Sequence, residues 1–584
     1  MDSAVATHLG ATAVRNGHSV ASSRPDVVRA LALYRAMATG RAVDRVEMEL
    51  VNRGEAFFHV GGAGHEASAA LNVHLTPDDW LHLHYRDKAL MLARGIPAEQ
   101  FFHSSLCTGA SHSAGRQMSA HLSAPELNVL SLVGPVGNNA LQAVGVAHEL
   151  VSRRTAHGSK GLPSLVVCSV GDGTSQQGEF LEAIAEAVRA QLPVLFCVED
   201  NGLAISTHTR SNTFYQHPRG DAAEFYGLPI HRLDGRDPLA CDRAFGPIVS
   251  GIRETPGPAI VVFQVERLTH HTNADDETRY REEGELKQVR AEADPLAKLR
   301  AQLREFGVPP SELEDLEAEI ERDVRAAADR ALIAPNPVAN LDARPPLSMQ
   351  LTIATEYRGD DSPKRLSMLE AMREVLRHHI SANSHVSMYG QDIEDPKGDV
   401  FGLTRGLSTA FPTQVRNSPL TESTIAGVSV GRALAGGQPV ACIQFADFLP
   451  IAFNQIASEL GSMHWRTHGG WQAPVIVMTP CGGYRPGLGP FHAQTFESVI
   501  AHVPGVDVVM PSTAADAAGL LNAAFASGRP TVFLYPKVCL NDPALSTSAD
   551  VARQMVLPGK ARFVTQGDDL TIVTWWATVP LCAR

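Results

Sequence analysis

The sequence predicts an α/β protein with two open parallel-sheet domains, each flanked by helices on both faces. Short apolar runs recur in both halves of the chain, and stretches with helical periodicity separate them. Buried strands that alternate with helices are typical of parallel sheets covered on both faces. A length of 584 residues with a hydrophobic fraction of 44% points to several buried cores rather than one.

The first half contains three predicted strands, at residues 165–170, 193–198 and 259–265. The first of them ends in glycines and is followed by a helical stretch at 179–190. Residues 294–333 are charged and have a helical period, so we expect them to form a pair of surface helices that closes this half.

The second half repeats the pattern, with predicted strands at 440–445, 475–478 and 506–509. Residues 334–364, between the halves, are rich in Pro, Asp and Asn and lack periodicity, which is typical of a linker. The sequence therefore predicts a disordered leader at 1–25, a first domain at 26–333, a linker at 334–364 and a second domain at 365–545.

The overall composition argues against some classes of function. Acidic residues outnumber basic ones by 63 to 50, a formal charge of -13, which argues against a protein that binds nucleic acid by neutralising phosphates. No apolar run reaches the length of a membrane span, and the first 25 residues lack the apolar core of a secretory signal. The eight cysteines include no C-x-x-C pair, so they signal neither zinc nor a redox pair and fit a reducing, cytoplasmic compartment.

Polar residues follow two consecutive strands of the first half. Gly171, Asp172 and Gly173 follow the strand at 165–170, and Asn201 lies 29 positions after Asp172, behind the next strand. Ligands of open parallel sheets bind at the carboxyl ends of strands, so we expect these residues to be neighbours there. Carboxylate and amide oxygens suit Mg²⁺, which takes further ligands from phosphates and water. The glycines let the backbone approach a diphosphate closely.

The segment from Gly171 to Asn201 resembles the diphosphate–metal motif of thiamine-diphosphate enzymes. The resemblance implies thiamine diphosphate and Mg²⁺ as cofactors. It implies three metal ligands: the side chains of Asp172 and Asn201, and the backbone carbonyl of Leu203.

Other motifs of the first half are similar to the alpha subunit of 2-oxo acid dehydrogenases. Tyr85 and Arg86 match the pair that contacts the diphosphate in that family, and the fork of an Arg side chain suits phosphate oxygens. Gly134 and Val136 lie in the segment that supports the bent cofactor, where relatives often have Ser and Leu. The resemblance therefore implies that these four residues are cofactor contacts.

The string from His270 to Asp276 is similar to the histidine loop of the branched-chain members of this family. The resemblance implies that His271 is catalytic. A His in a loop at the end of a strand can act as an acid, as a base or as a donor to a developing oxyanion.

The second half resembles the beta subunit of the same family. Glu422 stands in a segment similar to the loop whose glutamate hydrogen-bonds the cofactor's pyrimidine ring and activates it. Gln444 and Phe448 belong to a strand-end signature near that ring, with Phe448 in place of a common Tyr. His492 matches a second catalytic histidine. The family's beta subunit continues into a transketolase-type C-terminal domain, so we expect 546–584 to be the start of a truncated copy, with a first strand at 569–575.

The resemblance implies the decarboxylating component of a 2-oxo acid dehydrogenase, with two subunits fused in one chain. A 2-oxo acid, branched according to the motifs, would lose carbon dioxide with thiamine diphosphate as the electron sink. The acyl group would pass to the lipoyl group of an acyltransferase. We expect a homodimer, because sites in this family form between the two kinds of half.

Several alternatives stay open. The chain could be a stand-alone carboligase that makes an acyloin, or a component specific for pyruvate or acetoin. It could also be a catalytically silent scaffold, although Asp172, Asn201, Glu422 and both histidines are present. A nicotinamide-binding enzyme fits poorly, because no G-x-G-x-x-G follows an N-terminal strand.

Overall fold

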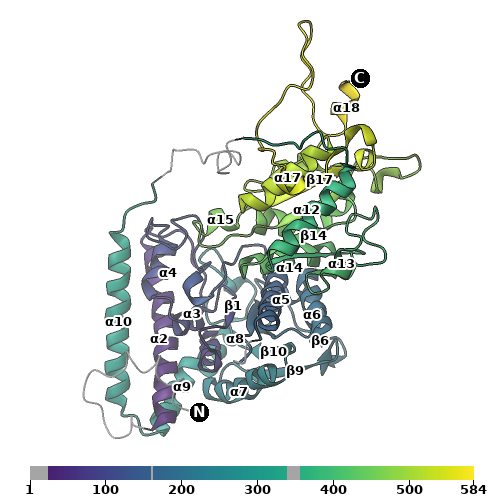
Figure 1. Ribbon diagram of the computed structural model, residues 1–584. Coiled ribbons are helices and arrows are strands. Elements are labelled where there is room, and N and C mark those ends of the chain that lie inside the picture. The colour runs from purple at the N-terminus through teal and green to yellow at the C-terminus, as the bar shows by residue number, and fades with distance from the viewer. Residues whose placement is uncertain (1–23, 159–161, 339–354, 584) are drawn as a thin grey trace. The chain divides into compact units, whose positions relative to one another are not determined.

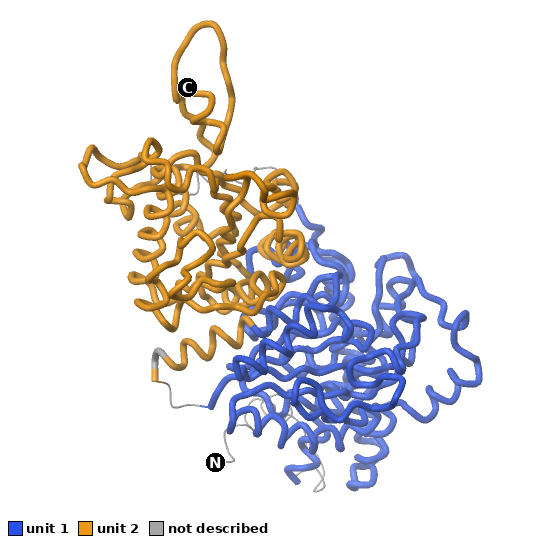
Figure 2. The backbone as a smooth tube through the Cα atoms, turned by 90° about the vertical axis from the view of Figure 1, so that its right-hand side faces the viewer, with its two compact units in different colours: residues 1–144, 160–338, 466–470 blue, residues 145–159, 339–465, 471–584 orange. Residues whose placement is uncertain are grey.

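The computed structural model describes residues 24–158, 162–338 and 355–583, and these form two compact units (Figure 2). The first unit comprises residues 24–144, 162–338 and 466–470, and the second comprises residues 145–158, 355–465 and 471–583. Residues 1–23 of the predicted leader and 339–354 of the predicted linker lie outside the described part. The domain boundaries proposed from the sequence stay a prediction.

The first unit is built on a six-stranded sheet with the order β1-β2-β3-β10-β9-β8. All neighbouring strands are parallel except β8 and β9, which are antiparallel. The central strands are buried over almost their whole length, as expected for a sheet covered on both faces. The strands are β1 (Trp80–His82), β2 (Val166–Gly171), β3 (Val194–Asp200), β8 (Glu224–Phe225), β9 (Leu228–Asp234) and β10 (Ala259–Gln264).

Helices cover this sheet and form the outer layer of the first unit. The predicted surface helix pair is confirmed as α9 (Pro295–Glu305) and α10 (Pro310–Leu332), and α10 runs alongside α2 (Pro25–Asn52) (Figure 1). The other helices are η2 (Glu66–His74), α3 (Lys88–Arg94), α4 (Ala98–Ser105), α5 (Asn139–His157), α6 (Gly178–Ala190), α7 (Pro238–Glu254) and α8 (Glu283–Glu292). Residues of α5 from 145 onward belong to the second unit.

The second unit contains a six-stranded sheet in which every pair of neighbours is parallel, with the order β13-β12-β14-β15-β17-β16. The predicted strands at 440–445, 475–478 and 506–509 are confirmed as β14, β15 and β16, with shifted bounds. The strands are β12 (Val386–Gly390), β13 (Val415–Asn417), β14 (Gln438–Cys442), β15 (Ile476–Cys481), β16 (Asp507–Val509) and β17 (Thr531–Pro536).

Local sequence signals explain where the main helices of the second unit begin. Ser367 and Thr513 cap α12 (Met368–Ala382) and α17 (Ala514–Ser527), and each forms a capping box with an acidic residue three positions later. These two helices pack against each other. Further elements are α13 (Leu407–Ala410), α14 (Glu422–Leu434), η6 (Ala446–Ala452), the π-helix η7 (Gln455–Leu460), α15 (Met463–Arg466) and α16 (Glu497–Ala501).

The C-terminal segment corrects one expectation from the sequence. β18 (Thr547–Ser548) pairs with β11 (Arg365–Leu366), and Val551 belongs to the core of the second unit. Residues 569–575, however, form no strand and are largely exposed, with Val573 85% exposed. A strand needs a neighbour to satisfy its backbone groups and bury its side chains, and no described segment pairs with these residues.

Among the described residues, no helix has both the length and the apolar character needed to cross a membrane.

Candidate functional site

Two of the three predicted metal ligands, Asp172 and Asn201, lie at neighbouring strand ends in the first unit. β2 and β3 are parallel neighbours, with Gly171 opposite Glu199, so Asp172 and Asn201 both follow the carboxyl ends of these strands. This predicted placement is confirmed. Gly173 is required here by packing, because a Cβ atom at this position would lie 2.6 Å from the Cβ atom of Ala204.

Asp172 is a buried carboxyl group whose ionisation a neighbouring positive charge would favour. Its side chain is almost fully buried, and this burial raises the pKa of the carboxyl group to about 6. The hydroxyl of Thr209 donates to Asp172 Oδ2 at 2.5 Å, which opposes this rise, and the nearby Asp200 adds to it. A divalent cation would supply the positive charge that favours the ionised carboxylate, so the residue fits a metal site.

Asn201 is oriented from both sides of its amide group. Its Oδ1 atom accepts a hydrogen bond from the backbone N–H of Leu203 at 3.1 Å, and its Nδ2 atom lies 3.4 Å from Nε2 of His65. Burial lowers the pKa of His65 to about 3, so its ring is neutral and has one donor and one acceptor nitrogen.

Glu199 sets the tautomer of His65. Its Oε2 atom lies 2.5 Å from Nδ1 of His65 and 3.2 Å from Nδ1 of His84, so both rings donate to the same carboxylate. The Nε2 atom of His65 is then left to accept from the amide of Asn201. The role of Glu199 could not be predicted from the sequence, because it depends on two histidines that come from distant segments of the chain.

A second buried cluster surrounds Lys88 on α3. Its ammonium group lies 2.5 Å from a carboxylate oxygen of Asp44 and also contacts Glu47, and both carboxylates come from α2. His59 Nε2 lies 3.4 Å from Asp44, whose other oxygen accepts from the backbone N–H of Gly62 at 2.6 Å. Lys88 therefore takes the place that a metal ion would need in this cluster, which anchors the loop before η2 to α2.

His271 lies beside Arg86 in the first unit. Arg86 donates to Nδ1 of His271 at 2.9 Å and to its carbonyl oxygen at 3.2 Å. Burial, reinforced by Arg86 and Arg267, lowers the pKa of His271 to about 4. An Arg side chain only donates, so Nδ1 accepts and the ring proton resides on Nε2. His271 is thus prepared as a neutral hydrogen-bond donor.

The loop that carries His271 is held by a chain of hydrogen bonds. Asp275 Oδ2 accepts from the backbone N–H of His271 at 2.9 Å and from the hydroxyl of Tyr280. Arg267 donates to the same hydroxyl at 2.6 Å and to the carbonyl oxygen of Ile205 at 2.9 Å. Arg267 therefore links the histidine loop to the segment that follows Asn201.

The remaining predicted contacts of the first unit occupy loops. The ring of Tyr85 lies 4.0 Å from the ring of His84, and the guanidinium carbon of Arg86 lies 5.2 Å from the centroid of Tyr85. Gly134 is exposed, Val136 is half-buried, and both precede the first turn of α5. Their roles toward a cofactor stay predictions.

Glu422 opens α14 in the second unit and is 4% exposed. A carboxylate in the first turn of a helix interacts favourably with the helix dipole. Glu422 follows β13, and Gln444 follows β14. These two strands are both parallel to β12, which lies between them, so both residues lie at the carboxyl ends of the strands.

His492 is packed in an aromatic environment in the second unit. Its ring centroid lies 4.8 Å from that of Phe445 and 5.8 Å from that of Phe448, with edge-on geometry in both cases. The structure thus brings together Phe448 and His492, two residues that the sequence predicted 44 positions apart.

Two further residues fix the backbone around His492. Lys537 donates to the carbonyl oxygen of His492, and Asp447 Oδ1 accepts from the backbone N–H groups of Ala493 and Gln494, each at 3.2 Å. The Lys537 ammonium also lies 4.9 Å from the centroid of Phe445, and its burial lowers its pKa. The role of Lys537 and Asp447 as a clamp becomes evident only in the fold.

Comparisons with known proteins match both units. The family described as "Dehydrogenase E1 component" matches residues 34–340, and the family described as "Transketolase, pyrimidine binding domain" matches residues 364–542. Together they indicate thiamine diphosphate as the cofactor, with Mg²⁺ as its usual partner metal. The buried Asp172 beside Asn201 and the close-packed Gly173 fit such a group.

Similar individual proteins are subunits of 2-oxo acid dehydrogenases. The chain is 38% identical over 212 residues to the 2-oxoisovalerate dehydrogenase subunit beta of Bacillus subtilis, which covers 36% of this chain and 63% of the relative. It is 29% identical over 280 residues to 2-oxoisovalerate dehydrogenase subunit alpha 1 of Arabidopsis thaliana, covering 48% and 57%. It is 33% identical over 218 residues to the pyruvate dehydrogenase E1 component subunit beta of Bacillus subtilis, covering 37% and 65%.

The chain therefore spans less than two thirds of the length of each of these relatives. The match to the first family nevertheless extends over residues 34–340, which is more than half of the 584-residue chain. The chain belongs to the dehydrogenase E1 component family.

Proposed function

We propose that this chain is the decarboxylating component of a 2-oxo acid dehydrogenase and that it acts on a branched-chain 2-oxo acid. The observation that carries the proposal is that one polypeptide contains an alpha-type segment followed by a beta-type segment. Residues 34–340 match the dehydrogenase E1 component family and residues 364–542 match the transketolase pyrimidine-binding family, and the similar proteins include a 2-oxoisovalerate dehydrogenase alpha subunit and a beta subunit. Between the two beta subunits of Bacillus subtilis, the chain is 38% identical to the 2-oxoisovalerate enzyme and 33% to the pyruvate enzyme, which favours a branched substrate.

In the proposed reaction, bound thiamine diphosphate supplies the electron sink that decarboxylation of a 2-oxo acid requires. Asp172, Asn201 and the carbonyl oxygen of Leu203 would hold Mg²⁺ against the diphosphate. Tyr85 and Arg86 would contact the diphosphate, while Gly134 and Val136 would support the bent cofactor. Glu422, Gln444 and Phe448 would bind the pyrimidine ring, and the carboxyl group of Glu422 would hydrogen-bond a ring nitrogen and so activate the cofactor.

The histidines act on the substrate in this proposal. His271, as a neutral ring protonated on Nε2, donates to the substrate oxygen on which negative charge develops. His492, held by Lys537 and Asp447, transfers a proton to or from the reacting substrate. Both rings are half-buried.

The proposed partners follow from the same reaction. The acyl group passes to the lipoyl group of an acyltransferase, and the chain works as a homodimer. The eight cysteines are all free thiols, and this supports a reducing, cytoplasmic location.

The experiment that tests this function is a substrate comparison. The purified chain is supplied with thiamine diphosphate, Mg²⁺ and an artificial electron acceptor, and carbon dioxide release is measured with 2-oxoisovalerate, other branched 2-oxo acids and pyruvate. We expect the highest kcat/KM with branched acids and loss of release in Glu422→Gln. Acyloin formation without an acceptor would identify a carboligase instead. Cofactor binding without turnover of any acid would refute an enzymatic role.

A further inference from the structure

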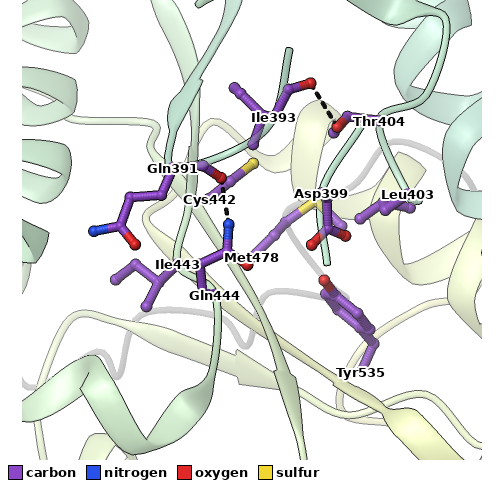
Figure 3. A pocket seen from close by; sticks show the side chains of 10 residues that line it. All are labelled: Gln391, Ile393, Asp399, Leu403, Thr404, Cys442, Ile443, Gln444, Met478 and Tyr535. Carbon is purple, nitrogen blue, oxygen red and sulfur yellow. Dashed lines mark hydrogen bonds between the residues drawn. The ribbon is translucent and has the colours of Figure 1, made fainter. Parts of the chain in front are cut away.

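A small cavity with a mixed polar and apolar lining lies inside the second unit, near the ends of β12, β14, β15 and β17 (Figure 3). Its volume, measured as the space open to the centre of a water molecule, is about 10 Å³, which is room for one water molecule. Its lining is contributed by Gln391, Ile393, Asp399, Leu403, Thr404, Cys442, Ile443, Gln444, Met478 and Tyr535.

Two hydrogen-bond acceptors that line this cavity have no partner among the described residues. They are Oδ2 of Asp399 and Oε1 of Gln444. The other oxygen of Asp399 accepts from the backbone N–H of Val400, and the amide nitrogen of Gln444 donates to the carbonyl oxygen of Gln391. Asp399 is only 7% exposed and Gln444 only 8%, so bulk water does not satisfy the two free atoms.

A hydroxyl group and an amide nitrogen without a partner in the described part of the chain, Nε2 of Gln391, also belong to the lining residues. Tyr535 is 2% exposed, and its hydroxyl points toward the carboxyl group of Asp399 (Figure 3). Two acceptors and one hydroxyl therefore line a space that admits a single water molecule. A buried water molecule typically makes about three hydrogen bonds, and the two acceptors and the Tyr535 hydroxyl supply that number.

We propose that this cavity binds one ordered water molecule, which donates to Asp399 Oδ2 and Gln444 Oε1 and accepts from the hydroxyl of Tyr535. The remaining lining residues favour a water molecule rather than a hard metal cation as the occupant of the cavity. The sulfur atoms of Cys442 and Met478 and the apolar side chains of Ile393 and Leu403 occupy positions where a cation would need oxygen ligands.

The bound water gives Asp399 and Tyr535 a role in positioning Gln444. The amide of Gln444 is held at its nitrogen by Gln391 and, through the water, at its oxygen by Asp399 and Tyr535. This consequence rests on the proposed function, in which Gln444 contacts the pyrimidine ring of thiamine diphosphate. Neither Asp399 nor Tyr535 touches the cofactor in this arrangement.

The water itself is tested by a high-resolution crystal structure of the full chain. We expect one density peak within hydrogen-bond distance of Asp399 Oδ2, Gln444 Oε1 and the Tyr535 hydroxyl, and its loss or displacement in Tyr535→Phe. A cavity without density, or a peak whose anomalous signal identifies a metal ion, would overturn the inference.

The positioning role is tested by titrating thiamine diphosphate into the full chain with Mg²⁺ present. We expect Tyr535→Phe and Asp399→Leu to raise the dissociation constant by about two- to ten-fold, the effect of one hydrogen bond. Met478→Leu, which lines the same cavity without a hydrogen-bonding group, is the matched control and should bind like the wild type.

The outcomes separate this inference from the proposed function. If the wild type binds thiamine diphosphate and both variants bind it equally well, the positioning role is refuted and the proposed function stays intact. A wild type that does not bind thiamine diphosphate would refute both the proposed function and the positioning role, and the crystallographic peak alone would then decide on the water.

Discussion

At the scale of single residues, the hydrogen bond between Arg86 and His271 fixes the chemistry that the histidine offers. Arg86 can only donate hydrogen bonds, so Nδ1 of His271 must accept, and the neutral ring carries its proton on Nε2. Burial keeps the ring neutral at the pH of the cell. The residue is therefore suited to donate a hydrogen bond rather than to accept a proton.

Substitution of His271 should separate catalysis from cofactor binding. We expect His271→Ala to lower kcat by about 10² to 10⁴, with thiamine diphosphate bound as in the wild type. His271→Gln, whose amide keeps a donor, should retain more activity than His271→Ala. The adjacent His270→Gln is the control in steady-state assays. Equal losses in the variants at positions 270 and 271 would show a general disturbance of the loop.

Asp399 gives a prediction about the pH dependence of stability. Burial raises the pKa of its carboxyl group to about 6 in the folded chain, above the ordinary value of 3.8. A raised folded pKa contributes stability below the unfolded pKa, and this contribution is lost as the pH rises through about 6. The full loss is about 3 kcal/mol by the conversion of two pKa units.

Asp399→Asn removes this titration, so its thermal midpoint relative to the wild type should rise between pH 4 and pH 8. Differential scanning calorimetry of both proteins across this range gives the comparison. A midpoint difference that does not change with pH would contradict a raised pKa at Asp399.

At the scale of elements, the parallel strands explain most of what could be predicted. The runs at 165–170 and 193–198 are apolar because β2 and β3 are covered on both faces, and that composition is visible in the sequence. The placement of Asp172 and Asn201 at neighbouring strand ends follows from it. The strand expected at 569–575 was wrong, because an apolar run forms a strand only where a neighbour pairs with it.

The backbone at His492 is held by buried Lys537, which donates a hydrogen bond to the carbonyl oxygen of His492. We expect Lys537→Met, which keeps the length of the side chain but removes its donor, to lower kcat by about ten-fold while thiamine diphosphate affinity stays unchanged. The matched control is Lys560→Met, because Lys560 is exposed. A loss of cofactor affinity equal to the loss of kcat would show that Lys537 acts on the whole fold rather than on His492.

The supporting contacts of the site could not be predicted from the sequence. His65 reaches Glu199 across 134 positions, and Lys88 joins Asp44 and Glu47 from another helix. A motif names the residues that a family shares, but these pairs depend on how distant segments pack. The sequence therefore singled out Asp172, Asn201, His271 and His492 as candidate site residues but gave no reason for their orientation.

At the scale of the whole molecule, one chain carries two units that match two separate families. Fusion keeps the two kinds of unit in equal amounts, and the proposed homodimer would pair them. Sedimentation velocity should then give a particle of about twice the chain mass of 62.6 kDa under assay conditions. Full decarboxylation by a species of single-chain mass would contradict the dimer.

The central claim is that Asp172 and Asn201 hold a metal that binds thiamine diphosphate to this chain, and a calorimetric titration of the cofactor tests it most directly. The titration is performed with and without Mg²⁺ on the wild type, Asp172→Ala and Glu422→Gln. We expect tight binding only with Mg²⁺, a loss of at least about 1.4 kcal/mol, or ten-fold in affinity, in Asp172→Ala, and binding retained in Glu422→Gln. Binding that is independent of Mg²⁺ and of Asp172, or no binding by the wild type, would contradict the account.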